Sequence, residues 1–184
     1  IRDALPDYAR DLKLNLGSVL TTTGAPGLNE KQIWSIALAS AIAARNTSFA
    51  RSVEVESRAH LAGVDVEGAK AAAAIMGMNN IYYRFLHLVE DGEYQTLPAR
   101  LRMNVIANHG IDKLDFELIS LAVSAVNGCG LCVTSHEKKL RAHDVSREAI
   151  QSAVRIAATI HAVAGVLEFE QSPPVASVPV ELVA

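Results

Sequence analysis

Apolar residues recur at intervals of three and four along most of this chain, which is the spacing that places them on one face of an α-helix. The pattern predicts helices over residues 32–45, 53–60, 67–88, 116–126, 132–142 and 147–168. Segments rich in Gly, Pro and Asn separate these helices, and no β-branched run alternates with polar residues as an amphipathic strand would. The sequence therefore predicts an all-α fold.

The end of the chain differs from the rest. The residues after position 170 carry three of the six prolines and no helical pattern. We therefore expect a single helical domain over residues 1–170, followed by an extended or disordered Pro-rich C-terminal arm over residues 171–184.

The helical part contains a weak internal repeat. The tripeptide Arg-Ala-His occurs at residues 58–60 and again at residues 141–143. At the same offset in numbering, Ile-Ala-Leu-Ala aligns with Ile-Ser-Leu-Ala. Such a period predicts an internally duplicated fold in which two helical units share a core, although chance similarity between Ala-rich helices is an alternative. The two copies would cover residues 28–90 and 111–170.

Charge and hydropathy exclude several kinds of partner. The net charge of −3 and the pI near 6.1 give no positive field that would attract nucleic acid or an anionic membrane. The longest uncharged apolar stretch, residues 33–44, is shorter than the ~20 residues that a spanning helix needs. The N-terminal residues lack a secretory apolar region, so we expect a cytoplasmic protein without membrane contact.

Both cysteines of the chain lie in the stretch NGCGLCVTSH, residues 127–136. The Asn-Gly pair predicts a helix break that places Cys129 at the start of the next helix, where the helix dipole favours thiolate over thiol. Cys132 follows three residues later, so the two sulfurs can meet across one helical turn. His136, four residues beyond Cys132, falls on the same helix face, where it can act as a base.

The preceding helix supplies a carboxylate. A thin polar stripe runs through its apolar sequence at helical spacing, and this stripe comprises Glu117, Ser120, Ser124 and Asn127. At the offset of the repeat, the equivalent positions of the first copy are the apolar residues Trp34, Ala37, Ala41 and Ala44. A solvated helix face is one interpretation of the stripe. The other is that Glu117 orients His136, which then takes the proton of Cys132.

Three kinds of site fit these residues. Zinc could be held by Cys129, Cys132 and His136 with Glu117, but structural zinc usually takes two separated ligand pairs, so we expect no metal. An inert buried cysteine pair would not require the histidine. A redox dithiol is favoured, and it is not that of thioredoxin, whose CxxC follows a strand.

Three segments together resemble a known family. AAAAIMGMNNIYYR (71–84), LRMNVIANHGI (101–111) and FELISLAVSAVNGCGLCVTSHE (116–137) are similar to the motifs of the AhpD family of alkylhydroperoxidases. The resemblance extends from about residue 5 to residue 168. It implies an all-helical, internally duplicated fold of the carboxymuconolactone decarboxylase type, assembled as a homotrimer.

The same resemblance implies a function. Family members reduce organic hydroperoxides without a bound cofactor, are re-reduced by dihydrolipoamide on a lipoyl-bearing acyltransferase, and pass electrons to an AhpC-type peroxiredoxin. The family pattern assigns the peroxidatic role to Cys132, the resolving role to Cys129 and the proton relay to Glu117 and His136. One departure is Leu131, because members of the family have a histidine between the cysteines.

Two alternatives remain open at this point. One is a dithiol adaptor that relays electrons from lipoyl domains to a peroxiredoxin without peroxidase activity, and the other is a non-redox member of the same fold. We expect the remaining polar residues of the family-like segments to serve in helix capping and subunit contacts, and Met76 and Met78 to serve in packing. These polar residues are Asn79, Asn80, Arg84 and Arg102, and the histidines without an expected role are His60, His87, His109, His143 and His161.

Overall fold

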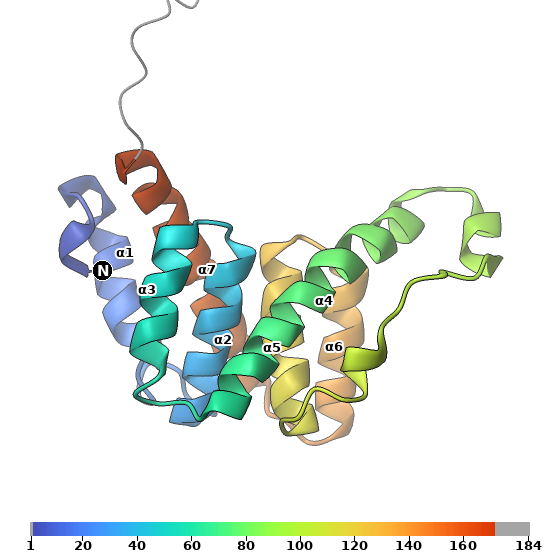
Figure 1. Cartoon of the computed structure of the whole chain (residues 1–184), viewed down its shortest axis with the longest axis horizontal. Coiled ribbons are helices and arrows are strands. Elements are labelled where there is room, and N and C mark those ends of the chain that lie inside the picture. Colours follow the sequence, from blue (N-terminus) through green and yellow to red (C-terminus); the bar gives the residue numbers. More distant parts are fainter. Residues whose placement is uncertain (1, 172–184) are drawn as a thin grey trace, which may run out of the picture.

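The computed structural model describes residues 2–171, and its regular structure there is helical, which confirms the all-α prediction (Figure 1). The α-helices are α1 Arg10–Val19, α2 Glu30–Ala43, α3 Thr47–Ser57, α4 Gly63–Leu88, α5 Lys113–Val126, α6 Gly130–Ala142 and α7 Arg147–Gln171. Short 3-10 helices are η1 Arg2–Ala4, η2 Asp7–Ala9, η3 Gly92–Thr96 and η4 Asn104–Ile106. From residue 172 onward, the predicted Pro-rich arm lies outside the described residues.

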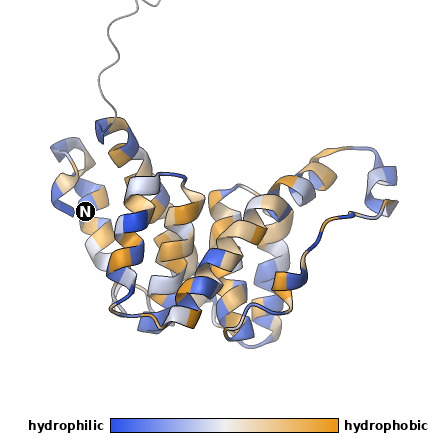
Figure 2. Ribbon diagram, viewed as in Figure 1, coloured by the Kyte–Doolittle hydropathy of each residue, from blue (hydrophilic) through white to orange (hydrophobic). Residues whose placement is uncertain are grey.

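The core forms around α2 and α5, which lie side by side in the middle of the molecule and both pack against α4 and α7. Residues 33–41 of α2 are all buried, and α5 buries residues 115–124. A helix that is covered on all sides needs mostly apolar residues, and both helices are mainly apolar (Figure 2), although α5 also buries polar residues, namely Asp115, Glu117, Ser120 and Ser124.

Helix α7 is long and apolar enough to cross a membrane by length and composition alone. Half of its most apolar window is buried inside the fold, where it packs against α2 and α5. The apolar residues of α7 are therefore accounted for by the protein core.

The two halves of the fold correspond at the offset found in the sequence. The bounds of α2, shifted by this offset, are the bounds of α5. The caps correspond as well, because Asn29 caps α2 and Asp112 caps α5, while Asn46 caps α3 and Cys129 caps α6. Helix bounds and caps thus repeat between the halves, as a duplication predicts. The descent of both halves from one unit stays a prediction.

Several helix starts differ from the sequence prediction, and the largest differences concern α3 and α1. Helix α3 begins at residue 47 and not near residue 53, because the side chain of Asn46 accepts a hydrogen bond from the backbone N–H of Phe49 at 2.8 Å. The segment that we interpreted as a break is therefore a helix start. Helix α1 was not predicted; it packs on α7, and its buried residues are Leu16 and Val19.

The second half of α4 and the segment that follows it project from the helical body (Figure 1). We call residues 81–101 the projecting arm. Six of its large apolar side chains are exposed, and they belong to Ile81, Phe85, Leu88, Tyr94, Leu97 and Leu101. Phe85 and Tyr94 pack edge to face, so the end of α4 and η3 are held together.

Replacement of Asn46 by alanine tests the capping of α3. The buried Asn46 side chain caps the helix and donates to the carbonyl of Ala164 at 3.3 Å, so Asn46→Ala removes two hydrogen bonds. We expect the free energy of unfolding in urea to fall by about 1–2 kcal/mol. The matched control, Ser48→Ala, changes an exposed residue in the same turn and should leave the unfolding midpoint unchanged.

Candidate active site

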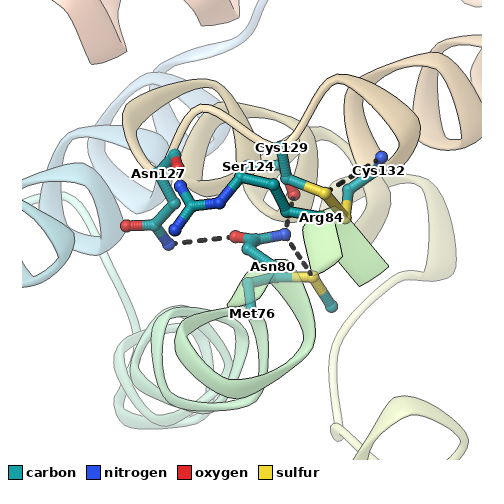
Figure 3. Close-up of a disulfide and its surroundings, with 7 residues drawn as sticks. All are labelled: Met76, Asn80, Arg84, Ser124, Asn127, Cys129 and Cys132. Carbon is teal, nitrogen blue, oxygen red and sulfur yellow. Dashed lines mark hydrogen bonds between the residues drawn. A yellow bond between two sulfur atoms is a disulfide. The ribbon is translucent and has the colours of Figure 1, made fainter. Parts of the chain in front are cut away.

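The two cysteines form a disulfide at the N-terminus of α6, with a Cα–Cα distance of 5.3 Å (Figure 3). Cys129 is the N-cap residue, and its Sγ accepts a hydrogen bond from the backbone N–H of Cys132 at 3.3 Å. A sulfur at this position lies against the unpaired N–H groups and the positive end of the helix dipole. The sequence expectation that the thiols lie in the first helical turn is thus met by the structure.

The turn between α5 and α6 sets the direction of α6. Gly128 has a positive φ of 68°, and the N–H of Cys129 donates back to the carbonyl of Ser124 at 3.1 Å. In the first half of the fold, Arg45 takes the same place with a φ of 66°. A positive φ is costly for residues with a Cβ, so glycine is the less strained choice beside the cysteines.

A chain of hydrogen bonds from α4 holds this turn (Figure 3). Arg84 Nη1 donates to the carbonyl oxygen of Asn127 at 2.7 Å, and Asn127 Nδ2 donates to Asn80 Oδ1 at 2.9 Å. Asn80 Nδ2 in turn donates to Ser124 Oγ at 2.8 Å. Arg84 therefore satisfies a carbonyl at the end of α5, in keeping with the expected capping role. The expectation for Asn80 was wrong, because this residue braces the disulfide turn inside the subunit through side-chain contacts.

Glu117 lies beside His136 in the structure. Glu117 Oε2 is 2.8 Å from His136 Nδ1, and Lys139 Nζ donates to the other carboxylate oxygen. Burial raises the pKa of the Glu117 carboxyl, but the hydrogen bonds from His136 and Lys139 outweigh burial and hold that pKa below its ordinary value. The Glu117 carboxylate therefore stays charged, and it is Nδ1 of His136 that contacts it.

A cavity of about 420 Å³ adjoins these groups. Most of its lining is apolar or aromatic, and it comes from α4, η4, α5 and α6; the lining residues are Met76, Asn79, Tyr83, Met103, Ile106, Phe116, Glu117, Leu131, Cys132, Ser135 and His136. Cys132 therefore faces the cavity together with His136. Cys129 is fully buried and does not line it, so the two sulfurs differ in access.

The polar stripe of α5 is not a solvated face. Glu117, Ser120 and Ser124 are all buried, and Ser124 belongs to the hydrogen-bond chain described above. The interpretation in which the stripe belongs to the site is the one that matches the structure. The catalytic roles of Cys132, Cys129, His136 and Glu117 stay predictions.

In the first half of the fold, apolar residues occupy the positions that correspond to Glu117, Cys132 and His136, and Asn46 occupies that of Cys129. A second cavity, of about 390 Å³, is lined by Trp34, Phe49 and Val53. At the offset of the repeat, these positions correspond to Glu117, Cys132 and His136. The same architecture is thus present twice, and the polar groups of the site are present once.

The part of the chain that the structure describes contains no cluster of metal ligands, and two of the other histidines stack on aromatic side chains. Within residues 2–171, the His, Cys, Asp and Glu side chains form no cluster of three that could hold a metal ion. His60 stacks on Trp34 in the first half. His109 stacks on Phe116, and burial lowers the pKa of its imidazole, so it acts as a packing residue behind the cavity wall.

Sequence reasoning missed several residues of the site. Lys139 follows His136 by three positions on one helix face, and this spacing could have indicated a second partner for Glu117. Met76, Asn79 and Tyr83 share one face of α4 and line the cavity. Their spacing gave no clue to the cavity, because the packing of α4 on α5 and α6 is not visible in the local sequence.

The fold and the site define an all-α protein that carries a CxxC-spaced, disulfide-bonded cysteine pair at a helix N-terminus beside an apolar cavity. Residues 92–169 match the model of the carboxymuconolactone decarboxylase family. Proteins named alkyl hydroperoxide reductase AhpD are similar over nearly the whole chain. The relative from Rhodospirillum centenum is 55% identical over 92% of this chain and 90% of its own length. Those from Frankia alni and Solibacter usitatus are both 54% identical, covering 91% and 93% of this chain and 89% and 95% of their own lengths, respectively.

This chain belongs to the AhpD family of alkyl hydroperoxide reductases. The identity extends over both halves of the fold and includes the region of the site. The family resemblance inferred from the sequence motifs is thereby confirmed.

A Glu117→Gln variant tests the charged state of the buried carboxylate. Because the pKa of Glu117 is lowered in the folded protein, its charge stabilises the fold above the ordinary carboxyl pKa of about 4.5. This contribution is lost as pH falls through the lowered folded-state pKa. The difference in free energy of unfolding between wild type and Glu117→Gln should therefore be largest near neutral pH and shrink below pH ~4.

Urea unfolding of both proteins over a series of pH values measures this difference. Glu90→Gln removes an exposed carboxylate beyond the end of α4 and serves as the control, with the same pH profile as wild type. A constant difference between wild type and Glu117→Gln across the whole range would contradict the assignment.

Proposed function

We propose that this protein reduces organic hydroperoxides with Cys132, forms the Cys129–Cys132 disulfide, and is re-reduced by a dithiol such as dihydrolipoamide. The observation that carries the proposal is the placement of one sulfur of a helix-capping pair in an apolar cavity beside His136. The names of the relatives agree with a hydroperoxide as substrate.

Access supports Cys132 as the sulfur that meets the peroxide. Cys132 lines the cavity, whereas Cys129 is fully buried behind it. In the reduced protein, His136 takes the proton of the Cys132 thiol, and Glu117 stabilises the imidazolium that results. The thiolate is the nucleophile that peroxide chemistry requires.

The first step oxidises Cys132. Its thiolate attacks the terminal oxygen of the hydroperoxide, so that an S–O bond forms and the O–O bond breaks. The sulfur supplies two electrons and becomes a sulfenic acid. The leaving alkoxide takes a proton from the His136 imidazolium and departs as the alcohol.

The second step forms the disulfide. Cys129 attacks the sulfur of the Cys132 sulfenic acid, and the hydroxide leaves as water with the proton of Cys129. The two Cα atoms are 5.3 Å apart across one helical turn, which supports bond formation without rearrangement of α6.

Re-reduction follows the same difference in access. A thiolate of the incoming dithiol attacks Cys132 Sγ, and Cys129 leaves as a thiolate. The N–H of Cys132 donates to Cys129 Sγ, and the helix dipole favours the negative charge, so Cys129 is a good leaving group. The second thiol of the donor then releases Cys132, and the donor becomes a disulfide.

The physiological partners are part of this proposal. A lipoyl-bearing acyltransferase in the cytoplasm would present the dithiol, and an AhpC-type peroxiredoxin would accept electrons. The alternative functions are an adaptor that relays electrons to the peroxiredoxin alone, and a non-redox enzyme of the same fold.

A lipoamide-linked peroxidase assay tests the proposal. We expect wild type to consume cumene hydroperoxide with dihydrolipoamide as the donor, and Cys132→Ser to lose at least about 100-fold in rate because the nucleophile is removed. Cys129→Ser should lose steady-state turnover and retain one oxidation of Cys132. An adaptor would consume peroxide only when the peroxiredoxin is added, and a non-redox enzyme would keep its activity in Cys132→Ser.

We also propose that the protein is a homotrimer in which the projecting arm packs on a neighbouring copy. The arm carries six exposed large apolar side chains on a segment that extends away from its own helical body. An exposed apolar patch of this kind is typical of an interface. The residues after the arm, Met103 and Ile106, line the cavity, so the interface would adjoin the site.

Charge substitution in the arm tests the oligomer. The double variant Phe85→Asp and Leu97→Asp should convert a trimer into monomers in light scattering coupled to size-exclusion chromatography, because buried carboxylates without partners are costly. Phe169→Asp changes an exposed phenylalanine of α7 and serves as the control with wild-type mass. A wild-type monomer, or a double variant that remains trimeric, would contradict this interface.

A further inference from the structure

One residue that lines the cavity, Asn79, has a buried side-chain oxygen without a hydrogen-bond partner. Among the residues that the structure describes, the buried side-chain oxygens without a partner are Ser40 Oγ, Asn79 Oδ1 and Ser120 Oγ. Of these residues, Asn79 is the one that lines the cavity with Cys132 and His136. Asn79 is only 4% exposed, so bulk water does not satisfy its amide oxygen.

Asn79 and Asn80 are adjacent in α4, but their side chains have different surroundings. Asn80 is committed to Ser124 and Asn127 through its amide nitrogen and oxygen, respectively. Asn79 shares the cavity face of α4 with Met76 and Tyr83, both of which contribute mainly apolar surface. A buried, unpaired amide oxygen costs free energy, and a ligand that donates a hydrogen bond there recovers it.

We propose that Asn79 binds the hydroperoxide group of the substrate, with Oδ1 accepting the hydrogen bond of the terminal O–H. This inference rests on the proposed function and adds the residue that aligns the peroxide. The apolar wall holds the organic group, and Asn79 presents the terminal oxygen to Cys132. The oxygen bonded to carbon then lies toward His136, which protonates it when the O–O bond breaks.

The hydrogen bond persists through the reaction. The hydrogen on the terminal oxygen is not transferred, because the S–O bond forms to that oxygen and the product is the Cys132 sulfenic acid. Asn79 Oδ1 therefore accepts from the same hydroxyl before and after attack. An alkylating agent without a hydroxyl group makes no such contact, and this difference provides the test.

The experiment compares two reagents on one thiol. In a Cys129→Ser background, Cys132 is the single thiol, and the serine keeps an oxygen at the cap of α6. The second-order rate constant for loss of the thiol is measured with tert-butyl hydroperoxide and, separately, with methyl iodide. Asn79→Leu replaces the amide by an apolar group of similar size, and Asn79→Ala is the smaller variant in case leucine disturbs packing.

We expect both Asn79 variants to react about 10- to 100-fold more slowly with the hydroperoxide and within about 2-fold of the parent with methyl iodide. Ser40→Ala is the matched control, because it removes another buried oxygen without a partner, in α2 and away from the cavity. It should match the parent with both reagents.

Each other result overturns the inference in a recognisable way. If the variants match the parent with both reagents, Asn79 does not bind the peroxide. If both rates fall together, Asn79 acts on the thiol and not on the substrate. If the parent thiol reacts with the hydroperoxide no faster than free cysteine does, the proposed function itself is wrong, and the inference is overturned with it.

Discussion

The backbone turn at Asn127 and Gly128 is the constraint on which the site depends. It ends α5 and starts α6 within three residues, so that Cys129 becomes a helix cap and Cys132 enters the first turn. Arg84 and Asn80 hold this turn from α4. Three helices therefore determine together where the sulfurs lie.

The position of His136 follows from the same turn. Because α6 leaves the turn alongside α5, the residue one turn after Cys132 comes to lie opposite Glu117. Lys139, three residues further along α6, reaches the same carboxylate. The buried carboxylate of Glu117 thus has two partners, His136 and Lys139, and their hydrogen bonds together lower its pKa. The fold supplies a fixed negative group at the wall of an apolar cavity.

The first half of the fold shows what the architecture needs for stability alone. There Asn46 caps the helix with a side-chain oxygen, and Phe49 and Val53 stand at the positions that correspond to Cys132 and His136 in the second half. The helix bounds are nearly unchanged. A half of this fold therefore packs without the cysteines, the histidine or the carboxylate, and this contrast agrees with the role that we propose for them. Local sequence spacing was sufficient to predict how Cys129, Cys132 and His136 lie along α6, because the i, i+3 and i, i+4 relations follow from helix geometry. Glu117 drew attention because the equivalent position of the first half is apolar.

The rest depends on contacts that local spacing does not contain. The start of α3 was misplaced because an asparagine such as Asn46 can end one helix or cap the next, and only the partner of its side chain decides. Asn80 was misassigned because its partners, Ser124 and Asn127, belong to a helix and cap that are distant from it in the sequence. The cavity itself was not predicted, because it exists only once α4 has packed on α5 and α6.

The complete burial of Cys129 affects how well the protein resists inactivation by excess peroxide. A long-lived sulfenic acid is oxidised by excess peroxide to a sulfinic acid, which ordinary dithiols do not reduce. In the proposed cycle, the resolving Cys129 lies one helical turn from Cys132, and its burial keeps it from contact with the peroxide that oxidises Cys132. Attack of Cys129 on the Cys132 sulfenic acid takes place within one helix, whereas further oxidation needs a second peroxide molecule to diffuse in. The geometry therefore favours the reversible disulfide over the irreversible sulfinic acid.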